Sequence, residues 1–345
     1  MAESTEQAFS TEQLVNDVLA TIEREREREI VARRFGLFDR KETLEQIGEL
    51  LGITRERVRQ LEKSVVTRLK TTAEQQGLPH IPEFQTQLTT LLQSIGDVAR
   101  VSDITAKLVN DANRLEQARV AFLAQLCPQL VVLQEDDNFY HSIAVRSAYD
   151  EKKLKSGVSK LIEAIKQLGE PKTAEEVATA AGMSDATKAA ALASTSKQLA
   201  TLNGRWGLVK WPMVNPKNIR DKIYVILKEQ GKHMHFNEIA DAIKKSEFKR
   251  KDVTTQAIHN ELIKDKRFVL IGRGIYALKE WGYEKGTVAD IISEVLKKEG
   301  GPLHRDEIVK RVLKSRYVKE TTILLNLQGK PQFKRVAKAT YALAE

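Results

Sequence analysis

The 345-residue sequence has one cysteine, 6% aromatic residues and no long hydrophobic run. A single cysteine, Cys127, excludes an intrachain disulfide and a zinc finger. It lies in the apolar segment AFLAQLCPQL, which favours a buried structural thiol over a nucleophile. No apolar run approaches the roughly 18 residues of a transmembrane helix. The polar start, MAESTEQ, is not typical of a signal peptide, so we expect a cytoplasmic protein with no membrane partner.

Motifs for catalysis, metal binding and nucleotide binding are also scarce. His233, His235 and His304 lack the spacing of a metal site and are more typical of helix caps or core histidines. The segment GRGIYA precedes no predicted helix, which argues against a nucleotide-binding glycine loop. No Ser-His-Asp, Cys-His or carboxylate pair has a supporting motif. We therefore predict no enzyme, no metal, no cofactor and no small-molecule substrate.

Charge is plentiful and slightly unbalanced. Charged residues make up 30% of the chain, and 56 Lys and Arg against 47 Asp and Glu give a net charge of +9. This excess suits a polyanionic partner without proving one. The length and the 41% hydrophobic content allow two to four domains with real cores.

The first 70 residues predict a series of short helices. Ser10 with Gln13, and Thr43 with Gln46, have the spacing of a capping box at a helix start. Glycines at 36 and 52 are expected helix ends. Two short helices joined by Gly52-Ile53-Thr54 are typical of a helix-turn-helix.

The rest of the sequence contains repeats of about 65–70 residues. Segments 219–243 and 288–312 share a pattern of two amphipathic helices around a turn that contains glycine. Each is followed by an alternating segment that predicts a β-hairpin, and a weaker copy covers 158–211. The fold class is therefore mainly α, with small β-hairpin wings. The predicted organisation is a helix-turn-helix domain over 10–72, a linker over 73–83, and winged-helix-like units over 84–150, 156–212, 216–283 and 286–345.

The helix expected after Thr54 has one apolar and one polar face. At about 100° per residue, a single apolar stripe must pack on the preceding helices. The stripe consists of Val58, Leu61, Val65 and Leu69. Glu56, Arg59, Gln60 and Lys63 face the other way. Arginine, glutamine and glutamate can read guanine, adenine and cytosine edges, and the second helix of a helix-turn-helix enters the major groove. The alternative is an ordinary charged face with internal ion pairs, as the upstream segment EREREREI suggests.

Residues 14–70 closely resemble the −35-binding domain, region four, of bacterial sigma-70 family factors. The shared segments are DVLATI, EREIVARRFGL and TLEQIGELLGITRERVRQLE. The resemblance implies two partners, double-stranded promoter DNA of the −35 type and the flap of the RNA polymerase β subunit. The residues that it places at DNA bases are Arg55, Glu56, Arg59 and Gln60. Those that it places near DNA phosphates are Arg34, Thr43 and Leu44, and Lys63 is our further prediction for the backbone.

Residues 217–283 resemble the HARE winged-helix module, also found in the delta subunit of RNA polymerase, and 287–344 resemble a diverged copy. The matching segments are IRDKIYVILKEQGKHMHFNEIADAI and FVLIGRGIYAL. Such modules imply contacts with DNA or with proteins of transcription and DNA-modification systems. Arg273, at the tip of a predicted hairpin, is either a wing contact to phosphate or part of an ordinary turn.

The leading hypothesis is a bacterial DNA-binding transcription factor, associated with RNA polymerase and located on the nucleoid. Nothing before residue 10 has room for the aromatic-rich helices with which sigma factors melt the −10 element, so we expect that activity to be missing. One alternative is a protein-interaction scaffold on RNA polymerase without sequence-specific DNA binding. Another is a DNA-binding accessory of a restriction or modification system.

Overall fold

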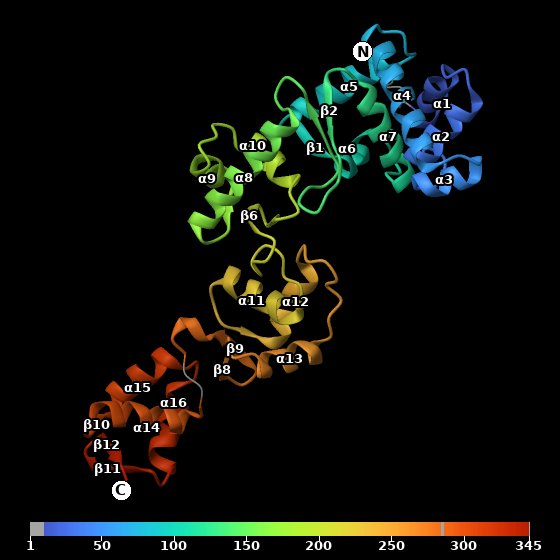
Figure 1. Cartoon of the computed structure of the whole chain (residues 1–345). Helices are drawn as coiled ribbons and strands as arrows, with labels where there is room; N and C mark the ends of the chain where they lie inside the picture. Colours follow the sequence, from blue (N-terminus) through green and yellow to red (C-terminus); the bar gives the residue numbers. More distant parts are fainter. Residues whose placement is uncertain (1–9, 284–285, 345) are drawn as a thin grey trace, which may run out of the picture. The chain divides into compact units, whose positions relative to one another are not determined.

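The computed structural model of this protein describes residues 10–283 and 286–344, so Glu345 of the last predicted unit lies outside the described residues. Helices dominate it, and its strands form small three-stranded antiparallel sheets (Figure 1). The predicted mainly α fold class with hairpin wings is confirmed. The chain divides into two compact units, Met1–Val209 and Lys210–Glu345.

The first four helices form the helix-turn-helix domain that the sequence predicts. They are α1 (Thr11–Ala20), α2 (Glu25–Phe35), α3 (Leu44–Leu51) and α4 (Arg55–Glu74). Ser10, Thr43 and Thr54 cap the starts of α1, α3 and α4, and Thr43 with Gln46 forms a complete capping box. Gly36 and Gly52 end α2 and α3 in the left-handed conformation that glycine adopts without strain.

The turn between α3 and α4 is tight because two glycines permit it. Gly52 has φ +63°, and a Cβ on Gly48 would lie 2.7 Å from the Ile53 carbonyl oxygen. The close approach lets Val58 of α4 pack on Ile30 and Ile47 in a small apolar cluster. This cluster holds the N-terminal half of α4 against α2 and α3.

After α4, four segments repeat one topology: helix, strand, helix, helix, strand, strand. In each sheet the last strand lies in the centre, paired with both others. The first copy contains α5 (Ile81–Ser94), β1 (Val98–Arg100), α6 (Val101–Leu108), α7 (Arg114–Leu126), β2 (Leu130–Leu133) and β3 (Ser142–Val145). The second contains α8 (Glu151–Leu168), β4 (Lys172–Thr173), α9 (Ala174–Ala180), α10 (Ala186–Ser194), β5 (Leu199–Leu202) and β6 (Arg205–Leu208).

The third and fourth copies follow the same order, which is that of a winged helix. The third contains α11 (Ile219–Gln230), β7 (Met234–His235), α12 (Phe236–Lys245), α13 (Thr255–Lys264), β8 (Phe268–Gly272) and β9 (Ile275–Leu278), followed by the 3-10 helix η1 (Lys279–Trp281). The fourth contains α14 (Val288–Glu299), β10 (Leu303–His304), α15 (Arg305–Ser315), α16 (Glu320–Gly329), β11 (Phe333–Ala337) and β12 (Thr340–Leu343). We call these copies the first to fourth winged helix.

The first winged helix shares its core with the helix-turn-helix domain. α7 packs against α1, α2 and α4 (Figure 1). Phe122 of α7 is 1% exposed, and its ring centroid lies 5.0 Å from that of Phe35. The predicted linker over 73–83 contains Leu78 and Ile81, each 2% exposed within this shared core. The segment between the two domains is therefore part of their shared core. The predicted domain boundaries stay a prediction.

A buried arginine adds a polar link to the same contact. Arg119 of α7 has a side chain that is only 5% exposed. It donates to the Leu37 carbonyl oxygen at 2.9 Å, and it pairs with Glu116 at 2.8 Å and Glu12 at 3.0 Å. These partners satisfy a charge that burial would otherwise make costly.

The first hairpin packs on the second winged helix. Phe139 forms an isolated antiparallel bridge with Ser196, and Lys197 pairs with Glu135 at 2.6 Å. Just before β1, which pairs with β3 of the hairpin, a Cβ on Gly96 would lie 2.7 Å from the Ala191 Cβ of α10. The third helix and the wing of the first winged helix are thus both packed against other parts of the first unit.

In the second unit, two histidines cap helices, which confirms one of the two alternatives for them. His235 accepts from the Asn237 amide at 3.2 Å at the start of α12, and His304 accepts from the Asp306 amide at 3.4 Å at the start of α15. The Lys222 side chain is buried and donates to the carbonyl oxygens of Lys249 and Arg250, which holds that basic loop in place.

Two further expectations concern burial. Cys127 is 2% exposed and its thiol donates to the Leu123 carbonyl oxygen, so the predicted buried structural thiol is confirmed. Burial raises the pKa of the Cys127 thiol to about 12, which keeps it protonated. Within residues 10–283 and 286–344, no helix combines the length and the apolar character that a membrane crossing requires.

Candidate nucleic-acid interface

The two faces of α4 lie as its sequence pattern predicts. Val58, Val65 and Leu69 are at most 3% exposed, and Leu61 is half-buried beside them. The opposite side is exposed along the whole helix. Its exposed residues include Arg55, Glu56, Arg59, Gln60, Lys63, Thr67 and Lys70. The residue types suited to base edges are therefore presented together on one solvent-facing side.

Three of these side chains form a hydrogen-bonded cluster. The Arg59 guanidinium donates two bonds to the Glu56 carboxylate, at 2.8 and 2.7 Å, and the Gln60 amide donates to it at 3.3 Å. The bonds from Arg59 lower the pKa of Glu56 to about 2, so this carboxylate is ionised at neutral pH and acts only as an acceptor. The same pairing raises the pKa of Arg59.

The cluster has features of both interpretations of this helix, a face that reads DNA bases and an ordinary charged face. An internal ion pair is present, as an ordinary charged face would have. Both side chains of the pair are 54% exposed, so it contributes little to stability because water screens it. The Arg59 guanidinium has more N–H donors than its two bonds to Glu56 use, so it can keep this partner and still donate to another acceptor.

The residues predicted at phosphates have different surroundings. Lys63 is exposed, whereas Thr43 uses its hydroxyl oxygen to accept from the Gln46 amide at the start of α3. Leu44 is half-buried and packs on the small cluster of Ile30, Ile47 and Val58. At this helix start, the backbone amides and the exposed end of α3 provide the anion-attracting groups.

Arg34 is held more tightly than the others. Its Nε donates to Glu62 of α4 at 3.1 Å, and its Nη1 donates to the Glu42 carbonyl oxygen at 3.3 Å. The side chain is 28% exposed, so part of the guanidinium still faces solvent. In the free protein, Arg34 therefore acts as a link between α2 and α4.

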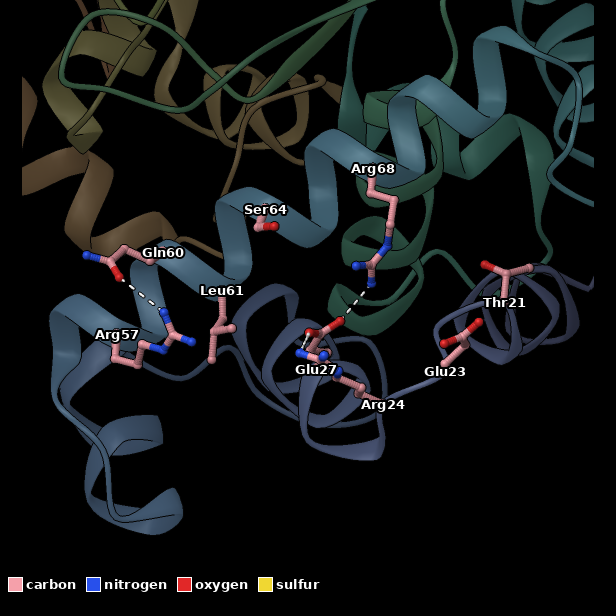
Figure 2. A pocket seen from close by; sticks show the side chains of 9 residues that line it. All are labelled: Thr21, Glu23, Arg24, Glu27, Arg57, Gln60, Leu61, Ser64 and Arg68. Carbon is pink, nitrogen blue, oxygen red and sulfur yellow. Dashed lines mark hydrogen bonds and ion pairs between the residues drawn. The ribbon is translucent and has the colours of Figure 1, made fainter.

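A polar groove of about 590 Å³ lies beside α4 (Figure 2). Figure 2 shows Arg68 and Arg24 directed at Glu27, and Arg57 directed at Gln60. Arg68 pairs with Glu27 at 2.7 Å, and the Glu27 side chain is only 8% exposed. Arg24 and Arg68 both reach Glu27, and the lining also contains Arg57 and the exposed Glu23, so the groove carries charges of both signs.

This groove was not predicted from the sequence. Glu27 and Arg24 belong to EREREREI, which reads as a uniformly charged face, and nothing local marks Glu27 as the residue that turns inward. Arg57 and Arg68 flank the predicted exposed face of α4 rather than lying on it. The groove depends on the ion pair between Glu27 and Arg68. These residues are far apart in sequence, so no local pattern indicates that they meet.

The third winged helix places its predicted wing residue in solvent. Arg273 is exposed at the tip between β8 and β9, next to Gly274 with φ +70°. A Cβ on Gly274 would lie 2.5 Å from the His235 Nε2 atom, so the turn requires glycine. Among the described residues, no group of three or more His, Cys, Asp or Glu side chains is arranged to hold a metal ion.

Comparison with known proteins concerns the helix-turn-helix domain. Residues 24–71 match the family profile of Sigma-70, region 4. The chain is 50% identical over 46 residues to RNA polymerase sigma factor sigB of Arabidopsis thaliana, which is 13% of this chain and 8% of that protein. It is 46% identical over 57 residues to RNA polymerase sigma factor SigA of a Bacillus species, 16% of this chain and 15% of that protein. It is 50% identical over 48 residues to RNA polymerase sigma factor RpoD of Helicobacter pylori, 13% of this chain and 7% of that protein.

The resemblance of the N-terminal domain to sigma-70 region four is thereby confirmed for residues 24–71. The matched segment spans 15% or less of the length of each of these relatives. It includes α2, α3 and most of α4, and therefore the cluster of Glu56, Arg59 and Gln60.

Proposed function

We propose that this protein is a bacterial transcription factor that binds double-stranded DNA and associates with RNA polymerase. The exposed cluster of Glu56, Arg59 and Gln60 carries the proposal. It lies within the segment that matches sigma-70 region 4, on the helix that a helix-turn-helix inserts into the major groove. The proposal involves no catalytic step, no metal and no cofactor.

The proposed target is duplex DNA of the −35 type. Arg59 and Arg55 would donate to guanine, Gln60 would pair with adenine, and the ionised Glu56 would accept from a cytosine amino group. The backbone contacts would come from the amino end of α3 and from the flank of α4. Their residues are Arg34, Thr43, Leu44 and Lys63.

The proposed protein partner is the flap of the RNA polymerase β subunit, and the location is the cytoplasm, on the nucleoid. Support comes from the names of the matched relatives, which are all RNA polymerase sigma factors. The third and fourth winged helices are proposed to be HARE-type modules. Arg273 is proposed as a phosphate contact of the third one.

A binding assay with Arg59→Ala tests the DNA proposal. The full-length protein would be titrated with a −35-type duplex and with a scrambled duplex of equal length. We expect the substitution to reduce the discrimination between the two by about 1–3 kcal/mol. Lys70→Ala, farther along α4, is the matched control, and we expect it to leave discrimination unchanged. Equal affinity of the wild type for both duplexes would sink the base-reading proposal.

A scaffold on RNA polymerase is the second candidate, and the charge of the first unit favours it. Residues 1–209 contain 27 Lys and Arg against 30 Asp and Glu, a net charge of −3, which does not attract DNA at long range. Co-purification with polymerase that survives nuclease treatment, by a protein that ignores both duplexes, would favour the scaffold. Loss of polymerase after nuclease treatment would favour the DNA-binding factor.

A further inference from the structure

The net positive charge of this protein lies in its second unit. Residues 210–345 contain 29 Lys and Arg against 17 Asp and Glu, a net charge of +12, whereas residues 1–209 carry −3. The total of +9 is therefore the sum of two units whose net charges have opposite signs. A polyanion is attracted to the unit that lies outside the sigma-like segment.

The four wings differ in their net charge. All four hairpins have the same place in the same three-stranded sheet, yet their net charges in chain order are −3, +1, +1 and +3. The charged residues are Glu135, Asp136 and Asp137 in the first, Arg205 in the second, Arg273 in the third, and Lys334, Arg335 and Lys338 in the fourth. The fourth wing alone combines several cations with no acid.

The cations of the fourth wing face solvent. Lys334 and Arg335 lie on β11, one of the two edge strands of its sheet, and Lys338 lies in the short turn to β12. All three are exposed, and so is Lys330 just before the strand. Within residues 10–283 and 286–344, none of the four forms an ion pair, and Arg335 donates only to the Ala337 carbonyl oxygen.

This situation differs from that of Arg311 in the same winged helix. Arg311 of α15 pairs with Glu299 at 2.6 Å and with Glu307 at 2.8 Å. Those charges are largely neutralised within the protein. The wing cations carry their charge outward instead.

Protection of an edge strand is the competing explanation, because exposed lysines discourage pairing between sheets of different molecules. The strands β2, β5 and β8 occupy the same edge position in the other three sheets. Their sequences, LVVL, LATL and FVLIG, contain no charged residue. β11 is also the most exposed of the four strands, so the duplex-binding experiment below has to separate edge protection from a contact to DNA.

We propose that the fourth wing is a sequence-independent contact to the phosphate backbone of double-stranded DNA. Lys334, Arg335 and Lys338 each approach a phosphate. The neighbouring α16 has the place of the recognition helix in this winged helix. It contains one acid and no Lys or Arg, so it has no cationic side chain with which to contact DNA bases. The contact is independent of base reading by α4 and lies in the other unit.

The positions of the three cations fit this role. Lys334 and Arg335 are neighbours on β11, and Lys338 follows an irregularity in the strand and begins the turn to β12. The three cations therefore lie within one short stretch at the end of the hairpin, where a single duplex can meet them.

The experiment measures duplex binding by the full-length protein at about 50 and about 200 mM salt. The variant is Lys334→Ala with Arg335→Ala and Lys338→Ala. We expect its affinity to fall by roughly tenfold or more on every duplex, whatever its sequence. The slope of log affinity against log salt should become shallower by about 2.7, which is the value for three phosphate contacts.

A matched control removes the same charge elsewhere in the fourth winged helix: Lys297→Ala with Lys298→Ala and Lys310→Ala. We expect it to retain most of the affinity and the slope. A second variant, Lys334→Arg with Arg335→Lys and Lys338→Arg, keeps the charge and should bind like the wild type, which separates charge loss from misfolding.

Three results would overturn the proposal. They are an alanine variant that binds like the wild type, a control that loses as much affinity, and tighter binding of single-stranded RNA than of duplex DNA by the wild type. Arg59→Ala distinguishes this proposal from base reading by α4, because it should alter discrimination between duplexes and leave the wing-dependent salt slope intact.

Discussion

The first and the fourth winged helix have the same order of elements and the same sheet topology, but their surroundings differ. In the first, α7 is buried against the helix-turn-helix domain and the acidic hairpin is bound to the second winged helix. In the fourth, α16 packs on α14 and α15 of its own copy, and the basic hairpin is exposed. One scaffold thus serves as an internal connector in one place and presents a free surface in another.

The comparison shows that fold alone does not assign function to a winged helix. The third helix and the wing are the parts that such a module offers to a partner. Where both are used inside the protein, as in the first copy, the module holds other domains in place. Where both are exposed and one is basic, as in the fourth, the module can take an external ligand.

The largest expected effect concerns the buried third helix. Phe122→Ala in α7 would open a cavity in the core shared by α1, α2, α4 and α7. We expect it to lower the free energy of unfolding by about 3–5 kcal/mol. Leu325→Ala in α16 is the counterpart, and since Leu325 is 68% exposed we expect a change within about 0.5 kcal/mol. Urea denaturation followed by circular dichroism measures both, and similar costs for the two would contradict the comparison.

The next effect concerns the buried guanidinium. Arg119→Met would leave the Leu37 carbonyl oxygen without its guanidinium donor. It would also remove the cation paired with Glu116, whose carboxylate keeps, among the described residues, only the Thr11 hydroxyl as a donor. We expect a loss of about 2–3 kcal/mol in the free energy of unfolding. Arg311→Met in the fourth copy is the control, because that side chain is 35% exposed and its pairs are solvent-screened. Its expected cost is below about 1 kcal/mol, and a cost equal to that of Arg119→Met would argue against the connector role.

The smallest expected effect is a pH dependence of the first hairpin. Asp136 accepts from the amides of Asn138 and Phe139, both at 2.8 Å, and these bonds lower its pKa. A carboxylate with a lowered folded-state pKa stabilises the fold above its unfolded value of about 3.9, and this stabilisation is lost as pH falls through the folded pKa. Asp136→Asn should therefore flatten the loss of stability of the first unit below about pH 4.

Chemical denaturation across the acid range would measure this slope. Asp137→Asn is the matched control, because among the described residues the Asp137 side chain accepts no amide hydrogen bond. An unchanged slope in Asp136→Asn, or an equal change in the control, would show that the hairpin is not held by this carboxylate.

Local features of the fold were predictable from the sequence. The caps Thr43 and Thr54 act between residues three apart, and the burial of Val58, Val65 and Leu69 follows from helical periodicity. The exposure of Glu56, Arg59 and Gln60 follows from the same periodicity, because a helix that buries one side exposes the other. Their contacts with DNA bases stay a prediction.

Features that depend on distant contacts were not predictable. EREREREI reads as a solvated face, yet Glu27 is buried and pairs with Arg68 of α4. The segment 73–83 reads as a linker, yet Leu78 and Ile81 enter a core with α1 and α7. In both cases the partner lies too far along the chain for a local pattern to show it.

By itself, the sequence determined the order of helices and hairpins, the polar face of α4 and the sign of charge on each wing, since these follow from residue type and spacing. Only the tertiary structure decided which of these surfaces are free. It buries α7 and the acidic first wing inside one unit, and it leaves the cluster on α4 and the basic fourth wing in solvent. The physical reason is that the packing of distant apolar and charged side chains, rather than local pattern, determines which faces lose contact with water.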